Sequence, residues 1–389
     1  MLKCNTGSSI NQNPELAAAQ AAAKAIEGLD SVKMAFVYGS ADYDIKAMMA
    51  GVTKAMPNIP VIGNTSFTGV ITPEGYISSE NGFIGIMAMS DADLAVGIAA
   101  SERTADSPEV IGAKIAKEAM QAAGKTCAPD YFYMVASPAE EEHYLKGITE
   151  VIGRVPFFGG SAADNEIAGK WSIYTADKIF ADGCAVAFFY TDGKFANEYT
   201  GAYHETNDVG VVTKMNGDRN IVEIDGVPSL EKYASWRNMD IEAVKGGALL
   251  VETICSPLGV KDRLGDLVAI RHPMNGNDDN TMNVGNMVAE KTAVIRMEAT
   301  VDELIDSTGN TLKALNTAMG TKPAAYHLVH CGGRRAGIGE RIDEVAKQLI
   351  AEANGVPFIC EFTFGEYGFK GDGLNTCGGL MLSFTGFGE

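Results

Sequence analysis

The distribution of apolar positions shows one pattern that occurs several times along the chain. A short β-rich run is followed by a turn of small residues, a helical stretch, and a segment with an aliphatic residue, a proline and further apolar residues. The β-rich runs and the proline-bearing segments occupy, in chain order, residues 34–38, 59–66, 131–135, 155–161, 326–330 and 356–366. This alternation of strand, turn, helix and strand predicts an α/β protein.

The spacing of the copies predicts how the chain is divided. Pro60, Pro156 and Pro357 hold the same place in the pattern, and they are 96 and then 201 residues apart. Because the second gap is about twice the first, we expect a fourth, degenerate copy between them, with residues 254–259 in register. Repeats of this length are domain-sized units. The predicted fold is therefore two related halves with mixed β-sheets covered by helices and an internal pseudo-repeat.

Length and composition agree with a globular protein of several domains. A chain of 389 residues exceeds the usual size of one hydrophobic core. We expect an N-terminal helical segment at 1–30, a first domain at 31–210 and a second domain at 211–389. The sequence has no apolar run of 18 residues and no signal-peptide h-region, so a cytoplasmic location away from membranes is expected.

Charge and cysteine content exclude several function classes. The chain has 31 basic and 50 acidic side chains, and a formal net charge of −19 would repel nucleic acids. Seven cysteines without a Cys-x-x-Cys pair favour reduced thiols over disulfides. His327 and His330 are three residues apart in one strand, on opposite faces, which argues against a shared metal. Neither a metal nor a cofactor is expected.

Gly-rich and polar turns follow the predicted strands, and they are the candidate ligand site. Glycine lets backbone N–H groups approach a ligand closely, and loops at strand ends commonly carry function. The polar side chains of some of these turns could equally form hydrogen bonds only with the backbone of their own turn. The candidate ligand-binding residues are Gly39, Ser40, Asn64, Thr65, Gly159, Gly160, Ser161, Asp164, Asn165, Cys331, Gly332, Arg334, Arg335, Glu361, Thr363 and Glu366.

Arg334 is the candidate for the main charge contact within this set. It follows a strand end in the sequence Cys-Gly-Gly-Arg, and its guanidinium can donate two parallel hydrogen bonds to a carboxylate. The alternative is that Arg334 pairs internally with Glu361 or Glu366 and holds two loops together. The sequence leaves both hypotheses open, ligand binding by Arg334 and an internal ion pair.

An enzyme is the competing class of function. Cys331 lies beside His330 and near Arg334, and such electropositive surroundings would lower the pKa of a thiol. Neighbours on a strand point to opposite faces, however, so His330 is poorly placed as its base. Glu361 and Glu366 are further acid/base candidates. The acidic residues 140–142 with His143 are most simply a solvated first helical turn.

The chain resembles the FIST family of sensory proteins, in both its N-terminal and C-terminal domains, over about residues 32–384. The segments that carry the resemblance are residues 35–40, 60–66, 156–160, 256–259, 296–297, 331–334 and 365–366. The turn Cys-Gly-Gly-Arg with the downstream Phe-Gly-Glu is the most specific of them. In one place the chain departs from the family, because Gly69 is followed by Val70 where relatives usually carry a glutamate.

The resemblance implies an intracellular protein that binds a small molecule, with amino acids or small carboxylates as the expected ligands. FIST domains often accompany signalling modules, so a separate signalling protein is the expected partner. A homo-oligomer is compatible with this reading.

Overall fold

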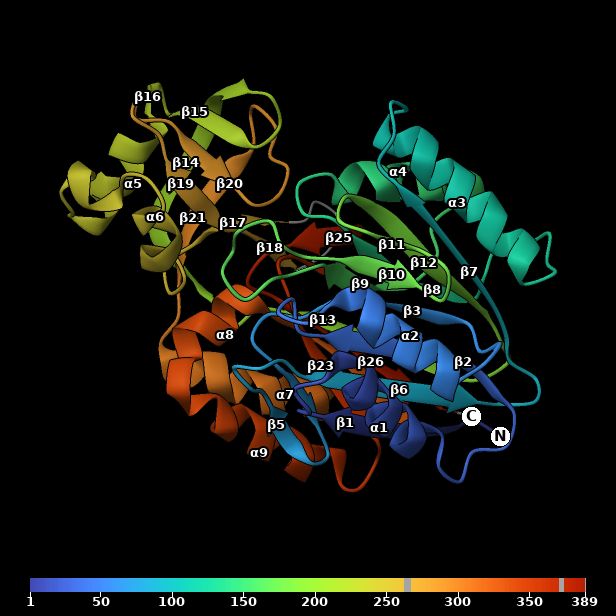
Figure 1. Cartoon of the computed structure of the whole chain (residues 1–389). Helices are drawn as coiled ribbons and strands as arrows, with labels where there is room; N and C mark the ends of the chain where they lie inside the picture. The colour runs from blue at the N-terminus through green and yellow to red at the C-terminus, as the bar shows by residue number, and fades with distance from the viewer. Residues whose placement is uncertain (262–266, 371–373, 389) are drawn as a thin grey trace.

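Three copies of one unit and an inserted domain make up the described chain (Figure 1). The structure is a computed structural model that describes residues 1–261, 267–370 and 374–388. Unit one contains β1 (Lys3–Ser9), α1 (Pro14–Ile26), β2 (Val32–Gly39), α2 (Ile45–Ala55), β3 (Val61–Thr65), β4 (Val70–Thr72), β5 (Gly75–Ile77) and β6 (Ile84–Ser90).

Units two and three repeat this order of elements. Unit two contains β7 (Ala95–Glu102), α3 (Pro108–Ala122), β8 (Tyr131–Ala136), α4 (Glu141–Ile152), β9 (Phe157–Ser161), β10 (Ile173–Thr175), β11 (Ile179–Phe180) and β12 (Gly183–Tyr190). Unit three contains β13 (Phe195–Thr200), α7 (Val301–Met319), β22 (Ala325–Cys331), α8 (Gly332–Ile338), the 3-10 turn Gly339–Arg341, α9 (Ile342–Ala353), β23 (Phe358–Thr363), β24 (Glu366–Phe369), β25 (Asn375–Gly378) and β26 (Leu382–Phe387).

Each unit builds a mixed sheet around one parallel strand pair. The pairs are β2 with β3, β8 with β9, and β22 with β23. An antiparallel strand flanks each pair, and the first strand of the unit pairs with it on the outside. The α/β class with mixed sheets, predicted from the repeated pattern, is confirmed.

The units exchange strands in a closed cycle. After each parallel pair, the next strand leaves its own unit: β4 pairs with β23, β10 with β3, and β24 with β9. Backbone hydrogen bonds at the strand ends follow the same cycle. They run from Phe67 N to Phe362 O (3.0 Å), from Ala163 N to Thr65 O (3.0 Å) and from Phe364 N to Ser161 O (3.1 Å). The three units therefore surround a common pseudo-threefold axis, and the ends of the parallel strands meet there.

The inserted domain, residues 204–298, explains the doubled spacing of the repeat. It contains β14 (His204–Asn216), β15 (Asn220–Ile224), β16 (Val227–Pro228), α5 (Ser229–Arg237), the 3-10 turn Ile241–Val244, α6 (Ala248–Glu252), β17 (Leu258–Lys261), β18 (Val268–Arg271), β19 (Pro273–Gly276), β20 (Met282–Val284) and β21 (Ala293–Glu298). The predicted fourth copy at 254–259 is wrong, because β17 in this stretch pairs antiparallel with β18 and β21. Units one and two thus form one half, and unit three with its insertion forms the other.

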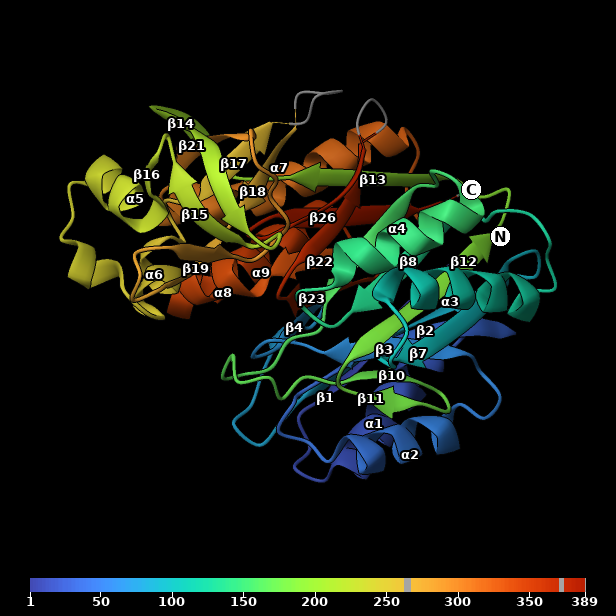
Figure 2. The same ribbon diagram turned by 90° about the horizontal axis from the view of Figure 1, so that it is seen from above.

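Helix pairs cover the outer faces of the three sheets, and the inner faces share one core. The pairs are α1 with α2, α3 with α4, and α7 with α9, each with its own apolar cluster. The core between the inner faces includes Met34, Phe36, Tyr38, Ile62, Tyr133, Phe158, Phe189, Ile359 and Phe387. The inserted domain has a separate core and stands to one side of this body (Figure 2).

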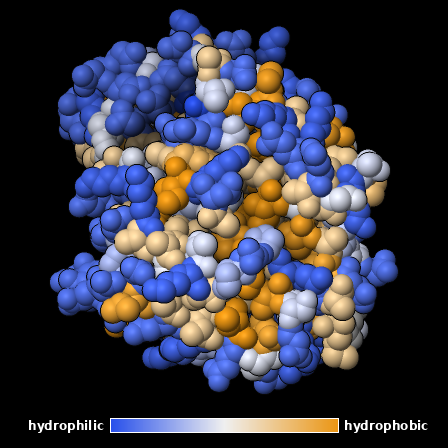
Figure 3. Space-filling view, turned by 45° about the vertical axis from the view of Figure 1, so that its right-hand side comes forward, coloured by the Kyte–Doolittle hydropathy of each residue, from blue (hydrophilic) through white to orange (hydrophobic). Residues whose placement is uncertain are grey.

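Local sequence signals explain where the principal helices begin. Helix α7 starts with a capping box in which Thr300 and Glu303 satisfy each other's backbone N–H groups. Helix α2 starts at Asp44, whose carboxylate accepts from two amides of the first turn. None of the described helices is long and apolar enough to cross a membrane. On the face shown in Figure 3, apolar residues gather in the middle and hydrophilic residues surround them.

Candidate functional site

The predicted ligand residues lie at the ends of the parallel strands, inside the molecule. Ten of their polar side chains have exposed fractions of 0–4%. These ten are Ser40, Asn64, Thr65, Ser161, Asp164, Cys331, Arg334, Glu361, Thr363 and Glu366. Asn165 and Arg335 are partly exposed. The structure divides the set into several separate groups of contacts.

One group lies on the pseudo-threefold axis and contains Asn64 and Glu361. The Asn64 amide donates to Glu361 Oε2 at 2.9 Å, and the Tyr133 hydroxyl donates to Asn64 Oδ1 (3.0 Å) or to Glu361 Oε1 (3.2 Å). Tyr38 bonds His327 Nε2 at 2.5 Å. Burial raises the pKa of Glu361 to about 7 and lowers that of His327 to about 3. This group is a buried network built from all three units.

Sequence reasoning missed the aromatic members of the axial group. Phe36, Tyr133 and His327 hold the same register in β2, β8 and β22, and their rings form a triangle with centroid distances of 5.1, 4.7 and 5.3 Å. Within an apolar run, Phe36 and Tyr133 look like ordinary core, and His327 was considered only as a metal ligand. Their equivalent places in the three copies were the signal that could have found them.

A second group surrounds Glu366. Its carboxyl accepts from the Thr363 hydroxyl at 3.0 Å and from the Met381 amide at 2.9 Å. The Ser161 amide donates to the carbonyl of Gly365 at 2.8 Å, which brings the second unit's loop against the third. Burial raises the pKa of Glu366 to about 8. Two predicted loops therefore do meet here.

Cys331 belongs to this second group as a packed thiol. Its sulfur accepts from the amides of Gly333 and Leu380, both at 3.2 Å. Burial, followed by the nearby Glu366 charge, raises the pKa of the Cys331 thiol. The expectation that its neighbours lower this pKa is wrong, because desolvation outweighs the electropositive surroundings. A thiol that stays protonated is a poor nucleophile, so the geometry does not favour Cys331 catalysis.

The two predicted arginines make different contacts. Arg334 donates Nη2 to Leu304 O at 2.8 Å and to Ser307 Oγ at 2.5 Å. Within the described ranges, no ion pair joins it to either of the two glutamates proposed as internal partners. Arg335 lies over the Tyr76 ring, 5.0 Å from its centroid, and donates to the Tyr76 hydroxyl.

The remaining predicted polar residues order their own loops. The Asp164 carboxylate accepts from three backbone N–H groups of the loop that follows it. Asn165 donates to Ser40 Oγ at 3.2 Å and accepts from Thr68 N at 2.7 Å, so it ties the first two units together. The Asp164 bonds are those of a turn that satisfies its own backbone, which was the alternative interpretation of the loops, whereas the Asn165 bonds join two units.

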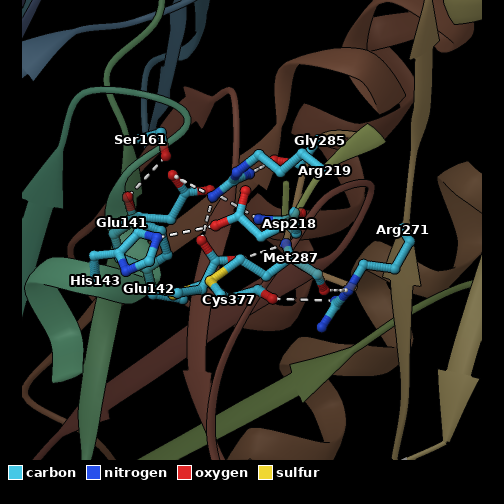
Figure 4. A network of polar contacts seen from close by, with 12 residues as sticks. Glu141, Glu142, His143, Ser161, Asp218, Arg219, Arg271, Gly285, Met287 and Cys377 are labelled. Carbon is cyan, nitrogen blue, oxygen red and sulfur yellow. Dashed lines mark hydrogen bonds and ion pairs between the residues drawn. The ribbon is translucent and has the colours of Figure 1, made fainter. Parts of the chain in front are cut away.

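A network that the sequence did not reveal joins α4 to the inserted domain (Figure 4). Glu141 and Glu142 in the first turn of α4 form ion pairs with Arg219, and Arg219 also donates to the carbonyl of Gly285. His143 bonds Asp218 at 3.0 Å. The interpretation of this turn as solvated is wrong, because Glu141 is only 1% exposed. Burial, and next the charge of Glu142, raise the pKa of Glu141 to about 8.

The loop before β21 completes the network and reaches a cavity. Asn286 donates to Glu141 Oε1 at 2.8 Å, and the Met287 amide donates to Glu142 Oε1 at 2.9 Å. The Met287 carbonyl accepts from Arg271 Nε at 2.9 Å. Thus the acidic turn of α4 and the side chain of Arg271 are held by the same loop of the inserted domain.

The cavity has a volume of about 500 Å³, and we name it the Arg271 cavity. Its lining residues are Glu142, Leu145, Lys146, Thr149, Glu150, Arg154, Arg271, Met287, Leu374, Asn375, Thr376 and Cys377. They come from α4 and the turn after it, from β18 and the loop before β21, and from β25 and the residue preceding it. The cavity therefore lies between unit two, the inserted domain and the hairpin of unit three.

Arg271 is the fixed cation of this cavity. Besides Met287 O, its guanidinium donates from Nη1 to Ile270 O at 3.1 Å and to Cys377 O at 3.3 Å. Its remaining nitrogen, Nη2, has no hydrogen-bond partner in the described part of the chain. Burial lowers the Arg271 pKa, and Glu142 is the foremost of the charges that oppose this effect. The guanidinium is held rigidly with one edge available to a ligand.

Comparison with protein families gives matches to two domain families that together cover almost the whole chain. The FIST N domain matches residues 33–227, and the FIST C domain matches residues 230–368. The chain belongs to the FIST family. FIST domains are generally sensory, ligand-binding domains. In this FIST protein the walls of the Arg271 cavity come from both domains and from residues 374–377 beyond them.

Comparisons with individual proteins add little. Comparison with curated proteins gives no match. Among solved structures, the chain is similar to a cyanuric acid hydrolase from A. caulinodans, with 10% identity, 99% of both chains covered and a TM-score of 0.40. It is also similar to phosphoribosylformylglycinamidine synthase II from Thermotoga maritima, with 10% identity, 100% of this chain and 72% of that chain covered, and a TM-score of 0.24. Similarity this low does not bear on what the FIST protein binds.

Proposed function

We propose that this FIST protein is a small-molecule sensor whose ligand, an amino acid or a small carboxylate, binds in the Arg271 cavity. The observation that carries the proposal is the Arg271 guanidinium, which lines the cavity and is fixed by three backbone carbonyl groups. Its Nη2 has no partner among the residues that the structure describes. A guanidinium held in place before binding can donate to a carboxylate with little loss of side-chain freedom.

The size and the walls of the cavity support a small organic ligand. Its volume of about 500 Å³ lies within the range of roughly 300–1,000 Å³ that is common for small-molecule sites. Leu145, Met287 and Leu374 supply apolar surface for the body of the ligand. A few fixed polar groups on apolar walls are the usual composition of such sites.

The acidic side of the cavity favours an amino acid within this ligand class. Glu150 lines the cavity, and within the described residues it has no ion-pair partner. It can therefore bind an ammonium group, while Glu142 is already bound to Arg219 and to the Met287 amide. A zwitterion would place its carboxylate at Arg271 and its ammonium at Glu150.

The position of the cavity supports a sensory role. A ligand there contacts both FIST domains, so binding adds interactions across their junction and shifts the chain toward the joined arrangement. We place the protein in the cytoplasm with a separate signalling protein as its partner. Seven free cysteines support a reducing location.

Calorimetric titration with a panel of amino acids and small carboxylates tests the proposal. Binding by the unmodified chain is expected, and Arg271→Gln should weaken it about ten- to a hundredfold, because a charge-assisted hydrogen bond contributes roughly 1.5–3 kcal/mol. Melting without ligand must accompany the titration, since Arg271 also holds three carbonyl groups. A panel with no binder at millimolar concentration would exclude this ligand class.

A second variant blocks the cavity without touching Arg271. Thr149→Phe places a ring in the cavity and should abolish binding, while the fold is retained. Thr317→Phe is the matched control, because both threonines lie on helices and donate to the carbonyl four residues earlier. Equal ligand affinity in the two phenylalanine variants would place the ligand elsewhere.

A further inference from the structure

The guanidinium of Arg334 is buried with most of its donors unused. Its side chain is 0% exposed, and only Nη2 has partners, Leu304 O and Ser307 Oγ. Nε and Nη1 have no hydrogen-bond partner among the described residues. Buried N–H groups of a charged side chain are rarely left unpaired, because each costs free energy comparable to a lost hydrogen bond.

The charge of Arg334 also lacks a carboxylate in contact. In the described part of the chain, no acidic oxygen lies within the 4.0 Å of an ion pair with Arg334. The acid that acts on it from farther away is Glu366, whose carboxyl is already bonded to Thr363 and Met381. Burial raises the pKa of Glu366 to about 8, so this carboxyl is largely protonated at neutral pH.

Arg334 cannot remove its buried positive charge by losing a proton. Burial lowers its pKa, but an arginine guanidinium remains charged in proteins. A buried charge is tolerated when a counter-charge with good geometry accompanies it. Leu304 O and Ser307 Oγ are neutral acceptors, and they fix the guanidinium without compensating its charge.

We propose that Arg334 binds a small monovalent anion inside unit three. The anion accepts hydrogen bonds from Nε and Nη1 and supplies the counter-charge that the surrounding side chains do not. Its class is that of a halide or the smallest carboxylates, because the Arg334 side chain is fully buried between α8, which carries it, and its hydrogen-bond partners in α7. The site is separate from the Arg271 cavity, which other residues line.

Crystallography with bromide tests the proposal on the unmodified chain. Crystals grown in sodium bromide should show an anomalous peak within contact distance of Arg334 Nε or Nη1. Crystals grown with sodium formate in place of bromide should show a planar carboxylate at these nitrogens if the site accepts carboxylates, and water there if the site accepts only halides. A well-ordered Arg334 with water alone at these nitrogens in bromide would overturn the proposal.

Thermal melting gives a second, independent measurement. When chloride replaces gluconate at constant ionic strength, the midpoint of the unmodified chain should rise by about 2 °C or more, since a ligand that binds only the folded state stabilises it. Arg334→Met should lose this dependence. Arg341→Met is the control, because Arg341 is exposed and already paired with Asp302 and Glu344.

The two variants decide the result even if one is unstable. A chloride dependence in the unmodified chain that persists in Arg334→Met would assign the effect to another site and overturn the proposal. If Arg334→Met does not fold, the bromide crystals of the unmodified chain decide alone. Loss of anion binding would leave binding in the Arg271 cavity intact, so the two proposals fail separately.

Discussion

Buried carboxyl groups determine much of the chemistry of the interior. Glu141, Glu361 and Glu366 are 0–1% exposed, and burial is the first cause of a raised pKa at each of them, to about 8, 7 and 8. At a pH between 4.5 and these raised pKa values, the folded chain therefore keeps protons on these carboxyl groups that the unfolded chain has already released. A protein with a formal net charge of −19 reduces its internal repulsion in this way.

Glu366→Gln should flatten the dependence of stability on pH. The folded-state pKa of Glu366, about 8, exceeds the ordinary value of 4.5, so folding favours the protonated carboxyl. The stability contributed by this group is complete below pH 4.5 and is lost as the pH rises through 8. A shift of this size corresponds to an upper bound on the order of 5 kcal/mol. The measurement is urea unfolding of both proteins between pH 5 and pH 9.

The control for this prediction is Glu80→Gln, which removes an exposed carboxyl. It should unfold with the same pH dependence as the unmodified chain. If Glu366→Gln and Glu80→Gln give the same slope of unfolding free energy against pH, the buried carboxyl of Glu366 is ionised in the folded state and the prediction is wrong.

Individual residues show what the sequence could and could not predict about the site. Polar side chains at the ends of strands were predicted, and the structure brings Asn64 to Glu361 as hydrogen-bonded partners. Their burial was not predicted, because a local pattern cannot show that three sheets close over the strand ends. Glu142 was assigned to a solvated turn since its partner, Arg219, lies 77 residues away in the chain.

At the scale of elements, two parallel pairs carry a glycine at the position where an exchanged strand is added. Gly63 and Gly159 lie opposite Tyr174 and Tyr367 of the exchanged strands. A Cβ on Gly63 would lie 1.8 Å from Val37 O, and one on Gly159 would lie 1.9 Å from the carbonyl oxygen of its own neighbour strand. In unit three, where the exchanged strand brings an isoleucine, the equivalent position is a cysteine. The glycines thus allow the two strands of each parallel pair to lie this close together where the exchanged strand is added.

Gly63→Ala should destabilise the chain strongly. The added methyl group collides with backbone, which cannot move without separating β2 from β3, and we expect a loss of roughly 3 kcal/mol or more. Gly247→Ala is the control, because no atom lies within 4 Å of the Cβ position there and a loss of only about 0.5 kcal/mol is expected. Chemical denaturation gives both values, and equal losses would contradict the close approach.

Elements were predicted well where the pattern was local and poorly where it was not. The parallel pairs and their turns follow from apolar spacing over short windows. The strand exchange between units could not be predicted, because β4, β10 and β24 are short and pair with residues of another unit. The fourth copy was predicted from the doubled spacing between Pro156 and Pro357, and an inserted domain occupies this stretch instead.

At the scale of the whole molecule, the inserted domain meets unit three through an apolar cluster, in which Ile270 and Met297 pack with Tyr199 and Leu380, and meets unit two through polar contacts. Arg219 contacts Glu141 and Glu142, and the loop at 285–287 binds the same two carboxylates. These contacts lie next to the Arg271 cavity (Figure 4), because Met287 lines it and its carbonyl holds Arg271. Under the proposed function, the ligand therefore binds beside the contacts that join unit two to the inserted domain.

Arg219→Met should loosen the contact between α4 and the inserted domain and, under the proposed function, weaken ligand binding. The side chains of Arg219 and Glu142 are 15% and 17% exposed, and removing one partner of a largely buried ion pair costs roughly 3–5 kcal/mol because it leaves the other charge unpaired. We expect faster hydrogen exchange at 285–287 and in the first turn of α4, with the core of the three units unchanged, and a lower affinity in calorimetric titration. Lys261→Met is the control, since it breaks an exposed pair with Glu205, which contributes at most about 1 kcal/mol. Faster exchange throughout the chain would mean that Arg219 supports global stability, whereas unchanged affinity with a loosened loop would separate the cavity from the junction.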